Sequence, residues 1–505
     1  MKNKFFSPLF ACSLISLLAA SCIDDKGNYE YEDANKVMPV TISGMRDTSV
    51  IMGSVLRIVP EVQHAENGDY VYSWFIMPSV TAGNLPRKTV LSNEIILDVP
   101  IKFDAGSYFL NFEVRDPKID VYVRKQIRLN LTATDINTGW FILKDVGDET
   151  DFDYISRDGT LYVQDVLLNR ALPEGSRPKG TAIQMNYQSQ RYYQQVTDDE
   201  GKVTTLANQQ VYHILSSHDI KTFNATTLVL FKNYEDQFYG VLPENCNPQG
   251  ISMRGTGDLY LLNDGKIYTI YGMVANVGKF GAPKPGFYTM FKDLFTTGSG
   301  ALCFDIESST FYHITTSGSN VTPLNEESEG VANPIGVSPR NMPYTMLNLL
   351  KADATTSASG VAVMKSKSEE KYYFASINYA GAAYPFRSFD LIPAQSKMPL
   401  AKVKAGPYSG SFVWFADANN LYVYKNADVP DREPVLMTYP VGETISYITH
   451  LFASGSYNYL VVLTNNATGW KLYVYNIISE GNPEIIETPA FTSSGSGFGR
   501  FVIYR

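Results

Sequence analysis

The sequence predicts an all-β protein in two parts, an N-terminal Ig-like β-sandwich followed by a β-propeller-like domain of about seven blades. Apolar and polar residues alternate with a period of two in many segments, and strand-like pairs recur at fairly regular intervals. Helical periodicity is scarce. The chain has 505 residues, 44% hydrophobic and 18% charged, which is enough to bury a large core and excludes a disordered chain.

The charge and the side-chain inventory narrow the possible functions. Lys and Arg number 42 against 51 Asp and Glu, a formal charge of −9, whereas nucleic-acid binding needs clustered positive charge. We therefore expect no nucleic-acid partner. The chain holds 34 Tyr, 27 Phe and 4 Trp but only 5 His. That balance favours a binding or scaffold protein over an enzyme that relies on acid–base chemistry.

The first residues predict export. Lys2 and Lys4 precede an apolar run from Phe5 to Ala20, and small residues lead up to Cys22. A basic start, an apolar stretch and a small-residue cleavage site indicate a secretory signal over residues 1–21. The segment Leu18-Ala-Ala-Ser-Cys22 resembles the lipobox of bacterial lipoproteins, although the family usually has Leu where Ala19 stands here. The resemblance implies that Cys22 is lipidated; the alternative is an ordinary signal with an incidental cysteine.

An acidic tether is expected over residues 22–37. It contains Asp24, Asp25, Glu30, Glu32 and Asp33. Acidic residues behind the lipidated cysteine resemble the signal that sends Bacteroidetes lipoproteins to the outer face of the outer membrane. A solvated flexible tether explains the same residues, and both readings can hold together.

Residues 38–135 predict the Ig-like sandwich. In Gly106–Asp116, alternate residues from Tyr108 to Val114 share one face, and Val121–Leu131 repeats the alternation. Trp74 supplies the large aromatic that a small sandwich buries at its centre. The strand around Trp74, together with Gly106-Ser-Tyr108 and Val114-Arg-Asp116, resembles the PKD-like group of domains. We assign these residues no chemistry.

Residues 138–505 predict the β-propeller-like domain. Seven hairpins start near residues 139, 227, 258, 301, 361, 411 and 459, a mean spacing of about 53 residues, which is near the length of a propeller blade. Asn263-Asp-Gly265 predicts a tight hairpin turn. The first interval is too long for one blade and is expected to carry an insertion or extra strands; it contains the polar stretch from Gln184 to Gln195. Tyr344–Lys351 is the best helical candidate. Gly499–Arg505 is expected to pair with the first blade and so close the ring. Two or three further sandwiches in series are the alternative.

Candidate sites are few. No sequence motif of a metalloprotease, serine hydrolase, P-loop or dinucleotide-binding protein occurs, so we expect no catalytic residue, cofactor or resident metal. The acidic cluster at 145–153 contains carboxylates that calcium prefers, but it lacks a regular calcium loop, and a solvated loop is the stronger interpretation. Cys246 and Cys303 are able to pair but cannot form a disulfide framework or a zinc site. Aromatic residues in polar segments between strands are candidates either for ligand contact or for packing: Tyr187, Tyr192, Tyr193, Tyr379, Tyr384, Phe386 and Phe389.

The order of these features resembles the PKD-like surface lipoproteins of Bacteroidetes over essentially the full length. The resemblance implies an accessory of a SusC/SusD-type outer-membrane transporter complex, lipid-anchored and facing the cell exterior. We therefore expect a non-catalytic protein that binds an oligopeptide or oligosaccharide ligand, docks on the transporter, or does both. The alternatives are a propeller-based degradative enzyme, such as a hydrolase or lyase, and an adhesin or structural spacer.

Overall fold

A computed structural model describes residues 40–505, except 52–54, 65–68, 80–87, 102, 104–105, 119, 133–135, 137, 171, 198–200, 254–256, 273–276, 287, 316–319, 355–356 and 480. The expected signal (1–21), the tether (22–37) and Cys22 therefore lie outside the described residues. The described chain is all-β; its helical elements are two short 3₁₀ helices, η1 (Tyr234–Asp236) and η2 (Met398–Leu400). No helix in this part of the chain has the length and apolar character needed to span a membrane. The residues form two compact units, one holding most of strands β1–β9 and the other strands β10–β39.

The first unit is built from one five-stranded sheet and two strand pairs. The sheet has the order β2-β9-β8-β5-β6, and the pairs are β1-β4 and β3-β7. Its strands are β1 (Val40–Ser43), β2 (Thr48–Ile51), β3 (Val55–Ile58), β4 (Glu61–His64), β5 (Val71–Pro78), β6 (Thr89–Ser92), β7 (Leu97–Pro100), β8 (Gly106–Asp116) and β9 (Val121–Thr132).

Trp74 lies at the centre of this unit, as the sequence predicted. Its side chain is fully buried and stacks on Phe112 with ring centroids 4.4 Å apart, and its indole N–H donates to the Ile95 carbonyl. The second face of β8 departs from simple alternation, because Asn111 and Glu113 are buried as well. Arg124 covers Glu113 through a 2.7 Å ion pair, so the charge is neutralised where it is buried.

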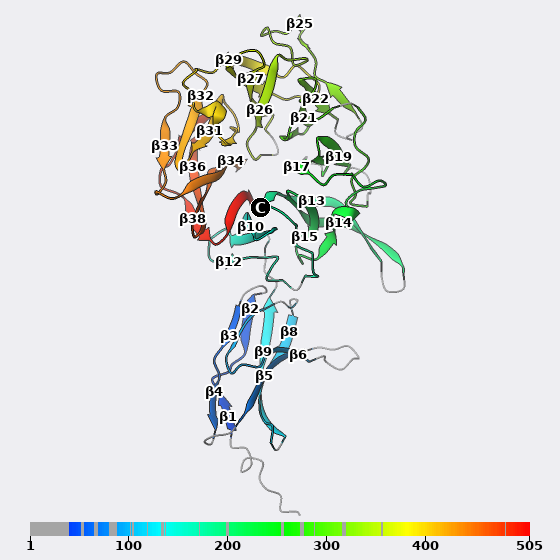
Figure 1. The fold of residues 1–505 in the computed structure, drawn as a ribbon, viewed down its shortest axis with the longest axis vertical. Coiled ribbons are helices and arrows are strands. Elements are labelled where there is room, and N and C mark those ends of the chain that lie inside the picture. Colours follow the sequence, from blue (N-terminus) through cyan, green and yellow to red (C-terminus); the bar gives the residue numbers. More distant parts are fainter. Residues whose placement is uncertain are drawn as a thin grey trace, which may run out of the picture. The chain divides into compact units, whose positions relative to one another are not determined.

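The second unit contains seven antiparallel sheets that follow one another in chain order (Figure 1). The first three are β39-β10-β11-β12, β13-β14-β15-β16 and β17-β18-β19; the last four are β20-β21-β22-β23, β26-β27-β28-β29, β30-β31-β32-β33 and β34-β35-β36, on which both β37 and β38 pair with β36. The first nine strands are β10 (Gly139–Val146), β11 (Glu149–Ser156), β12 (Tyr162–Val163), β13 (Ala182–Thr197), β14 (Val203–Ser216), β15 (Asp219–Asn224), β16 (Leu230–Lys232), β17 (Pro248–Met253) and β18 (Leu259–Asn263).

The remaining strands complete these sheets, apart from one small separate pair, β24 with β25. They are β19 (Lys266–Ile270), β20 (Phe295–Thr297), β21 (Gly300–Asp305), β22 (Thr310–Ile314), β23 (Val321–Pro323), β24 (Glu327–Ser328), β25 (Val331–Ala332), β26 (Tyr344–Leu350), β27 (Ser359–Ser366), β28 (Tyr372–Asn378), β29 (Phe386–Leu391), β30 (Val403–Ala405), β31 (Phe412–Asp417), β32 (Asn420–Lys425), β33 (Val435–Thr438), β34 (Thr444–Ser454), β35 (Tyr457–Asn466), β36 (Gly469–Ser479), β37 (Asn482–Ile485), β38 (Phe491–Gly495) and β39 (Phe498–Tyr504).

The core of the second unit lies between neighbouring sheets. Each sheet shares a buried hydrophobic cluster with the next along the chain; Phe141 and Tyr212, for example, join the first sheet to the second. One further cluster joins the last sheet back to the first, and it contains both Trp470 of β36 and Trp140 of β10. The packing between sheets is therefore cyclic, although no single sheet closes on itself.

The last strand of the chain belongs to the first sheet. Strand β39 pairs antiparallel with β10 from Trp140–Tyr504 to Asp145–Phe498, with a register shift beside Leu143. This confirms the predicted pairing of the C-terminal segment with the start of the second unit. The predicted turn at Asn263-Asp-Gly265 is also confirmed, because Asp264 and Gly265 have φ of 50° and 70° as they link β18 to β19.

Two predicted elements are wrong, and one open alternative is decided. The helical candidate at 344–351 is strand β26, which pairs with β27 from Tyr344–Ser366 to Leu350–Val361. For the stretch 184–195 the open alternative of extra strands is correct, because it is part of the 16-residue strand β13, which pairs with β14. The segment 227–231 does not begin a hairpin with 237–240; β16 pairs instead with β15, and Gln237 follows η1. In each case, pairing with a neighbouring strand outweighs the local signal.

Candidate functional site

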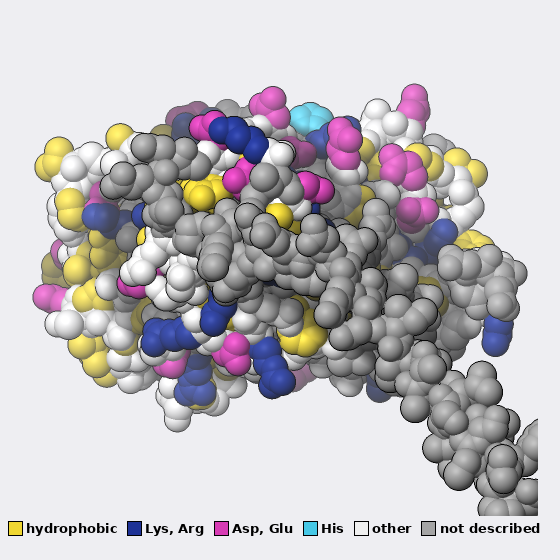
Figure 2. Space-filling model, turned by 90° about the horizontal axis from the view of Figure 1, so that it is seen from below, with side chains coloured by type: hydrophobic (Ala, Val, Ile, Leu, Met, Phe, Trp, Pro, Cys, Tyr) yellow, Lys and Arg dark blue, Asp and Glu magenta, His cyan; other side chains and the backbone are white. Residues whose placement is uncertain are grey.

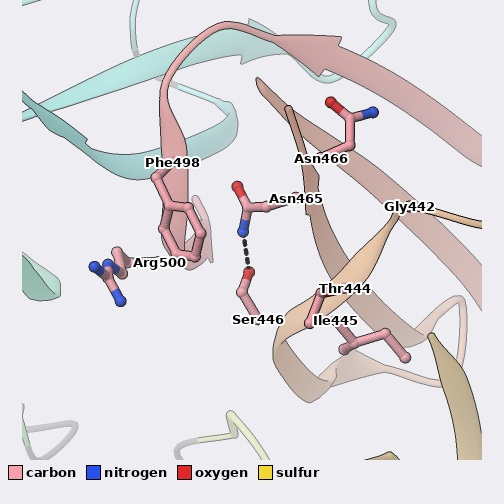
Figure 3. A pocket seen from close by; sticks show the side chains of 8 residues that line it. All are labelled: Gly442, Thr444, Ile445, Ser446, Asn465, Asn466, Phe498 and Arg500. Carbon is pink, nitrogen blue, oxygen red and sulfur yellow. Dashed lines mark hydrogen bonds between the residues drawn. The ribbon is translucent and has the colours of Figure 1, made fainter. Parts of the chain in front are cut away.

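A shallow recess lies where the last sheet meets the first (Figure 3). Its volume is about 440 Å³, at the small end of the range for ligand pockets. We call it the Phe498 recess. Three strands supply most of its lining, β34, β35 and β39, together with the turn before β34: Gly442, Thr444, Ile445, Ser446, Asn465, Asn466, Phe498 and Arg500.

Asn465 and Ser446 form the floor of the recess. The Asn465 carboxamide accepts from the Gly499 N–H at 2.7 Å and donates to the Gly499 carbonyl at 2.9 Å and to Ser446 Oγ at 2.7 Å. Ser446 Oγ donates to the Gly499 carbonyl at 2.9 Å. A glycine is needed at 499, because a Cβ there would lie 2.8 Å from Leu463 Cδ2 and 3.0 Å from Trp470 Cβ. The floor is a fixed hydrogen-bonded frame rather than a set of free groups.

Phe498 and Arg500 form one wall. The Phe498 ring is 44% exposed, and the Arg500 guanidinium lies 4.3 Å from its centroid. Arg500 is held in turn by Asp145 of β10, with Nη2 and Nε 2.7 and 2.8 Å from Oδ2. Val441, next to the lining residue Gly442, is completely exposed. The recess thus presents an aromatic ring, aliphatic surface and one oriented cation.

Glu443 anchors the turn that enters the recess. Its buried carboxylate accepts from Thr464 Oγ1 at 2.8 Å and from the Tyr473 hydroxyl at 3.1 Å, and it pairs with Lys471. Burial alone would raise the pKa of Glu443, but the hydrogen bonds from Lys471, Thr464 and Tyr473 outweigh it and lower the pKa. The carboxylate therefore stays ionised and structural, and it does not line the recess.

The lining has the chemistry of binding rather than of proton transfer. None of the eight lining residues is Asp, Glu, His, Cys or Lys, and the Arg500 guanidinium is a hydrogen-bond donor without an acceptor. Ser446 has no base among these residues to activate it, since its neighbours are the Asn465 amide and the Gly499 carbonyl. Contact with apolar surface and hydrogen bonding to an acceptor are what these groups offer a ligand.

The acidic cluster at 145–153 does not gather around one point. Asp151 accepts from the backbone N–H groups of Phe152, Leu167 and Leu168, and burial raises its pKa to about 7 against the effect of those hydrogen bonds. Asp153 is fully buried and lies 2.7 Å from Lys144 Nζ. The other members have separate partners or positions: Asp145 pairs with Arg500, Glu149 pairs with Arg177, and Asp148 lies in the turn between β10 and β11. Within the described residues, no group of three or more Asp, Glu, His or Cys is placed to hold a metal ion.

The other candidate residues are distributed through the fold. His213 is buried between Thr222 Oγ1 and Gln188 Oε1, and burial lowers its pKa to about 3. His218 is exposed on the turn after β14. Cys246 and Cys303 are free thiols, half-buried and buried, so they do not form a disulfide. Burial raises the pKa of Cys246 to about 12, which leaves it an unreactive thiol.

The aromatic residues that the sequence offered as possible ligand contacts mostly pack inside the protein. Tyr192, Tyr379 and Phe386 are buried in clusters between sheets. Tyr187, Tyr384 and Phe389 are half-buried and pack against the same kind of cluster, and Tyr193 is half-buried on β13. The sequence placed Arg500 on the predicted terminal strand and Phe498 just before it, but it did not predict the recess. The contact of β39 with β34 and β35 brings the lining of the recess together.

The surface carries both signs of charge. Acidic and basic side chains are interspersed over the face seen in Figure 2, together with scattered apolar ones. The described side chains on that face therefore form a mixed surface and not a basic stripe of the kind that binds a phosphate backbone.

Comparison with known proteins identifies one region. Residues 22–172 match the PKD-like family, a stretch that includes strands β1–β9 and continues through β12 of the second unit. The first unit is therefore PKD-like as well as Ig-like in fold. A search among curated proteins gives no match for the chain.

Proposed function

We propose that the protein is a non-catalytic, surface-exposed lipoprotein whose second unit is a seven-bladed β-propeller that binds a polymer-derived ligand, in the first place an oligopeptide. The observation that carries this proposal is the Phe498 recess, which joins an exposed ring and an oriented guanidinium but has no acid–base pair in its lining. Such a lining supports capture without turnover.

Two features support the propeller. The second unit has seven consecutive antiparallel sheets with a cyclic series of clusters between them. The C-terminal strand β39 joins the sheet that β10 begins, so the two ends of the unit are held by main-chain hydrogen bonds. Radial repetition of this kind protects sheet edges and presents loops on broad faces, where binding sites vary without disturbing the core.

An oligopeptide fits the recess better than a glycan does. The exposed Phe498 ring and the neighbouring Val441 offer contact to an apolar side chain. Arg500 is a donor for a backbone carbonyl or a carboxylate of the ligand. A neutral sugar favours several donors and acceptors together, and the Asn465 and Ser446 groups of the floor are already engaged by Gly499.

The place of action follows from the sequence resemblance. A lipid on Cys22 would anchor the chain in the outer membrane, and the acidic tether would direct it to the exterior. The PKD-like match over residues 22–172 supports the resemblance to PKD-like surface lipoproteins. We propose on that basis that the protein docks on a SusC/SusD-type transporter complex and delivers ligand to it. Co-purification of a transporter with the full chain from native membranes is the test of this part.

The binding proposal is tested with the full chain, the Phe498→Ala variant and a matched control. Mixed oligopeptides and mixed neutral oligosaccharides are incubated with each protein, and both retained and newly formed molecules are identified by mass spectrometry. Loss of the ring should weaken peptide binding about fivefold to tenfold, the effect of removing one aromatic contact. Tyr239→Ala is the control, because Tyr239 is 69% exposed and does not line the recess.

Each outcome has a clear reading. Peptides retained by the wild type and by the Tyr239 variant, but lost from the Phe498 variant, support the proposal. Retention of oligosaccharides alone would replace the peptide by a glycan. Cleaved products at an enzyme-like rate contradict a non-catalytic role and favour a degradative enzyme. Retention of neither class, with a transporter still co-purified, favours a docking protein or spacer.

A further inference from the structure

The side-chain oxygens that line the Phe498 recess are mostly occupied by the protein itself. Asn465 Oδ1 accepts from the Gly499 N–H, and Ser446 Oγ accepts from Asn465 while it donates to the Gly499 carbonyl. Asn466 Oδ1 accepts from two main-chain N–H groups and from Thr468 Oγ1 in the turn after β35. A ligand that brings hydrogen-bond donors therefore finds few side-chain acceptors here.

The groups that stay open to a ligand are mainly donors. The two main-chain N–H groups fix which end of the Asn466 amide is the oxygen, so its NH₂ end is the one without a partner in the described chain. Arg500 uses Nε and Nη2 for Asp145, and among the described residues no other group engages the N–H bonds of Nη1. Thr444 is exposed, and its hydroxyl has no hydrogen-bond partner in the part of the chain that the structure describes. The recess therefore suits a ligand that brings acceptors.

The open donors lie on two sides of the recess (Figure 3). Phe498 and Arg500 both come from β39, whereas Thr444 begins β34 and Asn466 ends β35. The exposed Phe498 ring lies beside the guanidinium, 4.3 Å from it. A ligand that uses both sides has an acceptor and an apolar group at one end, and further acceptors behind them.

Charge selects the acceptor at the Arg500 end. The Arg500 side chain is 41% exposed, whereas that of its partner Asp145 is 15% exposed, so a ligand meets the guanidinium side of this ion pair. Glu443, in the turn that enters the recess, is buried and paired with Lys471. A carboxylate is the acceptor that binds a guanidinium most strongly, because the hydrogen bonds between them are charge-assisted.

We infer that the Phe498 recess holds the C-terminal end of an oligopeptide, with the terminal carboxylate at Arg500. The last apolar side chain lies on the Phe498 ring, and main-chain carbonyls of the preceding residues accept from Asn466 and Thr444. This inference rests on the proposed function, because it names which end of the same ligand the recess binds. Every peptide has such an end whatever its sequence, and hydrolysis of a peptide bond produces it, so the recess takes the products of proteolysis.

The test compares three acetylated tetrapeptides on the full chain. The first is acetyl-Ala-Ala-Ala-Leu with a free carboxylate, the second is its C-terminal amide, and the third is the amide of acetyl-Ala-Ala-Glu-Leu, whose carboxylate is on a side chain. Each is also made with Phe or Val as the last residue. Acetylation removes the N-terminal charge, so the first two peptides differ only in the terminal carboxylate. Calorimetric titration, or NMR shift titration for weak binding, gives the dissociation constants.

Three variants separate the contributions. Arg500→Gln removes the guanidinium, Asn466→Asp keeps the oxygen that the turn needs but replaces the NH₂ donor, and Arg157→Gln is the control. Arg157 is exposed and lies over the Tyr457 ring at 4.8 Å, much as Arg500 lies over Phe498, but it does not line the recess. The free acid and the amide are compared on one protein preparation. A partly unfolded variant therefore changes both affinities and leaves their ratio intact.

We expect the wild type and Arg157→Gln to bind the free acid about fivefold to tenfold more tightly than the amide. The ratio should fall to about one in Arg500→Gln, and Asn466→Asp should weaken the binding of both peptides. Equal affinities of the wild type for the free acid and the amide overturn the inference but leave peptide binding in place. So does a Glu amide that binds as tightly as the free acid, because any carboxylate then suffices. If none of these peptides binds, the inference fails, and the mixed oligopeptides of the earlier test decide the proposed function separately.

Discussion

Asn465 and Gly499 hold each other through two hydrogen bonds, one in each direction between the Asn465 carboxamide and the Gly499 backbone. Asn465 is the second-last residue of strand β35 in the last sheet, and Gly499 lies on β39 in the first. The pair therefore links the two sheets that complete the cyclic packing of the second unit. Both residues are buried, so the bonds are shielded from competing water.

Replacement of Asn465 by alanine should destabilise the second unit by about 2–3 kcal/mol. The variant loses the two bonds to Gly499 and leaves the Gly499 N–H buried without a partner, a cost of this order. Urea unfolding followed by tryptophan fluorescence measures the change. Asn320→Ala, at an exposed position, is the control and should stay within about 0.5 kcal/mol of the wild type. Equal stabilities for the two variants would show that the hydrogen bonds between Asn465 and Gly499 do not stabilise the second unit.

Lys144→Met should be among the most damaging single substitutions. Lys144 is fully buried on β10, with Nζ 2.7 Å from Asp153 and 2.7 Å from Asp165, so its loss leaves an unpaired charge in the core. We expect a loss of about 3–5 kcal/mol in the free energy of unfolding. Adding Asp153→Asn should recover part of it, because the neutral amide still has an oxygen for the Trp470 indole N–H. A double-mutant cycle measures this coupling, and strictly additive effects would contradict it.

We expect the folded protein to lose stability in mild acid because of His450. Its ring is satisfied only when neutral: Nδ1 accepts from the Tyr408 N–H, and Nε2 faces Asn458 Oδ1 at 2.8 Å. Burial lowers the pKa of His450 from 6.5 to about 4. Between pH 6.5 and pH 4, His450 is protonated in the unfolded chain but neutral in the folded chain. The contribution of the neutral His450 ring to the free energy of unfolding is complete above pH 6.5 and is lost as the pH falls toward 4.

The measurement is the free energy of unfolding at pH 7 and pH 5. The wild type should lose about 2 kcal/mol more than His450→Gln over this interval, because the variant lacks the titrating group. His218→Gln, at an exposed histidine, should keep the wild-type slope. Parallel slopes for the wild type and His450→Gln would contradict the assignment.

Cys22→Ala should release the protein from the membrane fraction. Each buried lipid methylene contributes about 0.8 kcal/mol, and the acyl chains on Cys22 are the anchor that the sequence predicts. Fractionation of cells followed by immunoblotting measures the shift. Asp24→Ala combined with Asp25→Ala should leave the protein membrane-bound but reduce its exposure to protease added to intact cells. A Cys22 variant that stays firmly in the membrane fraction would reject lipid anchoring.

Alternation and turn chemistry predict much of the fold. The strands of the third predicted hairpin onward are recognisable because each is short, apolar and bounded by polar turns, as at Leu259–Asn263 and Lys266–Ile270. Strand β13 was not identified from the sequence because it is rich in Gln, Asn and Tyr. Its pairing with β14 cannot be predicted from amino-acid composition. Tyr344–Leu350 has good helix formers, but its pairing with β27 decides its conformation.

The candidate sites depend on contacts that sequence patterns do not contain. Phe498 and Asp145 are paired across 353 residues of chain, and the Phe498 recess exists only through such pairings. Conversely, the acidic residues at 145–153 look like one cluster in sequence because they are adjacent there. Alternation along β10 and β11, and separate partners such as Lys144 and Arg500, disperse them in space.

The pairing of β39 with β10 also governs when the second unit can become complete. A ribosome releases the chain from its N-terminal end, so β10, β11 and β12 emerge first and wait for a partner strand that is synthesised last. Until Phe498–Tyr504 arrives, one edge of β10 offers unpaired main-chain groups to any passing strand. A product that stops a few residues early would retain nearly the whole core yet expose that edge. Premature termination near the C-terminus should therefore be harmful out of proportion to the few residues lost, and aggregation, rather than partial activity, is its expected signature.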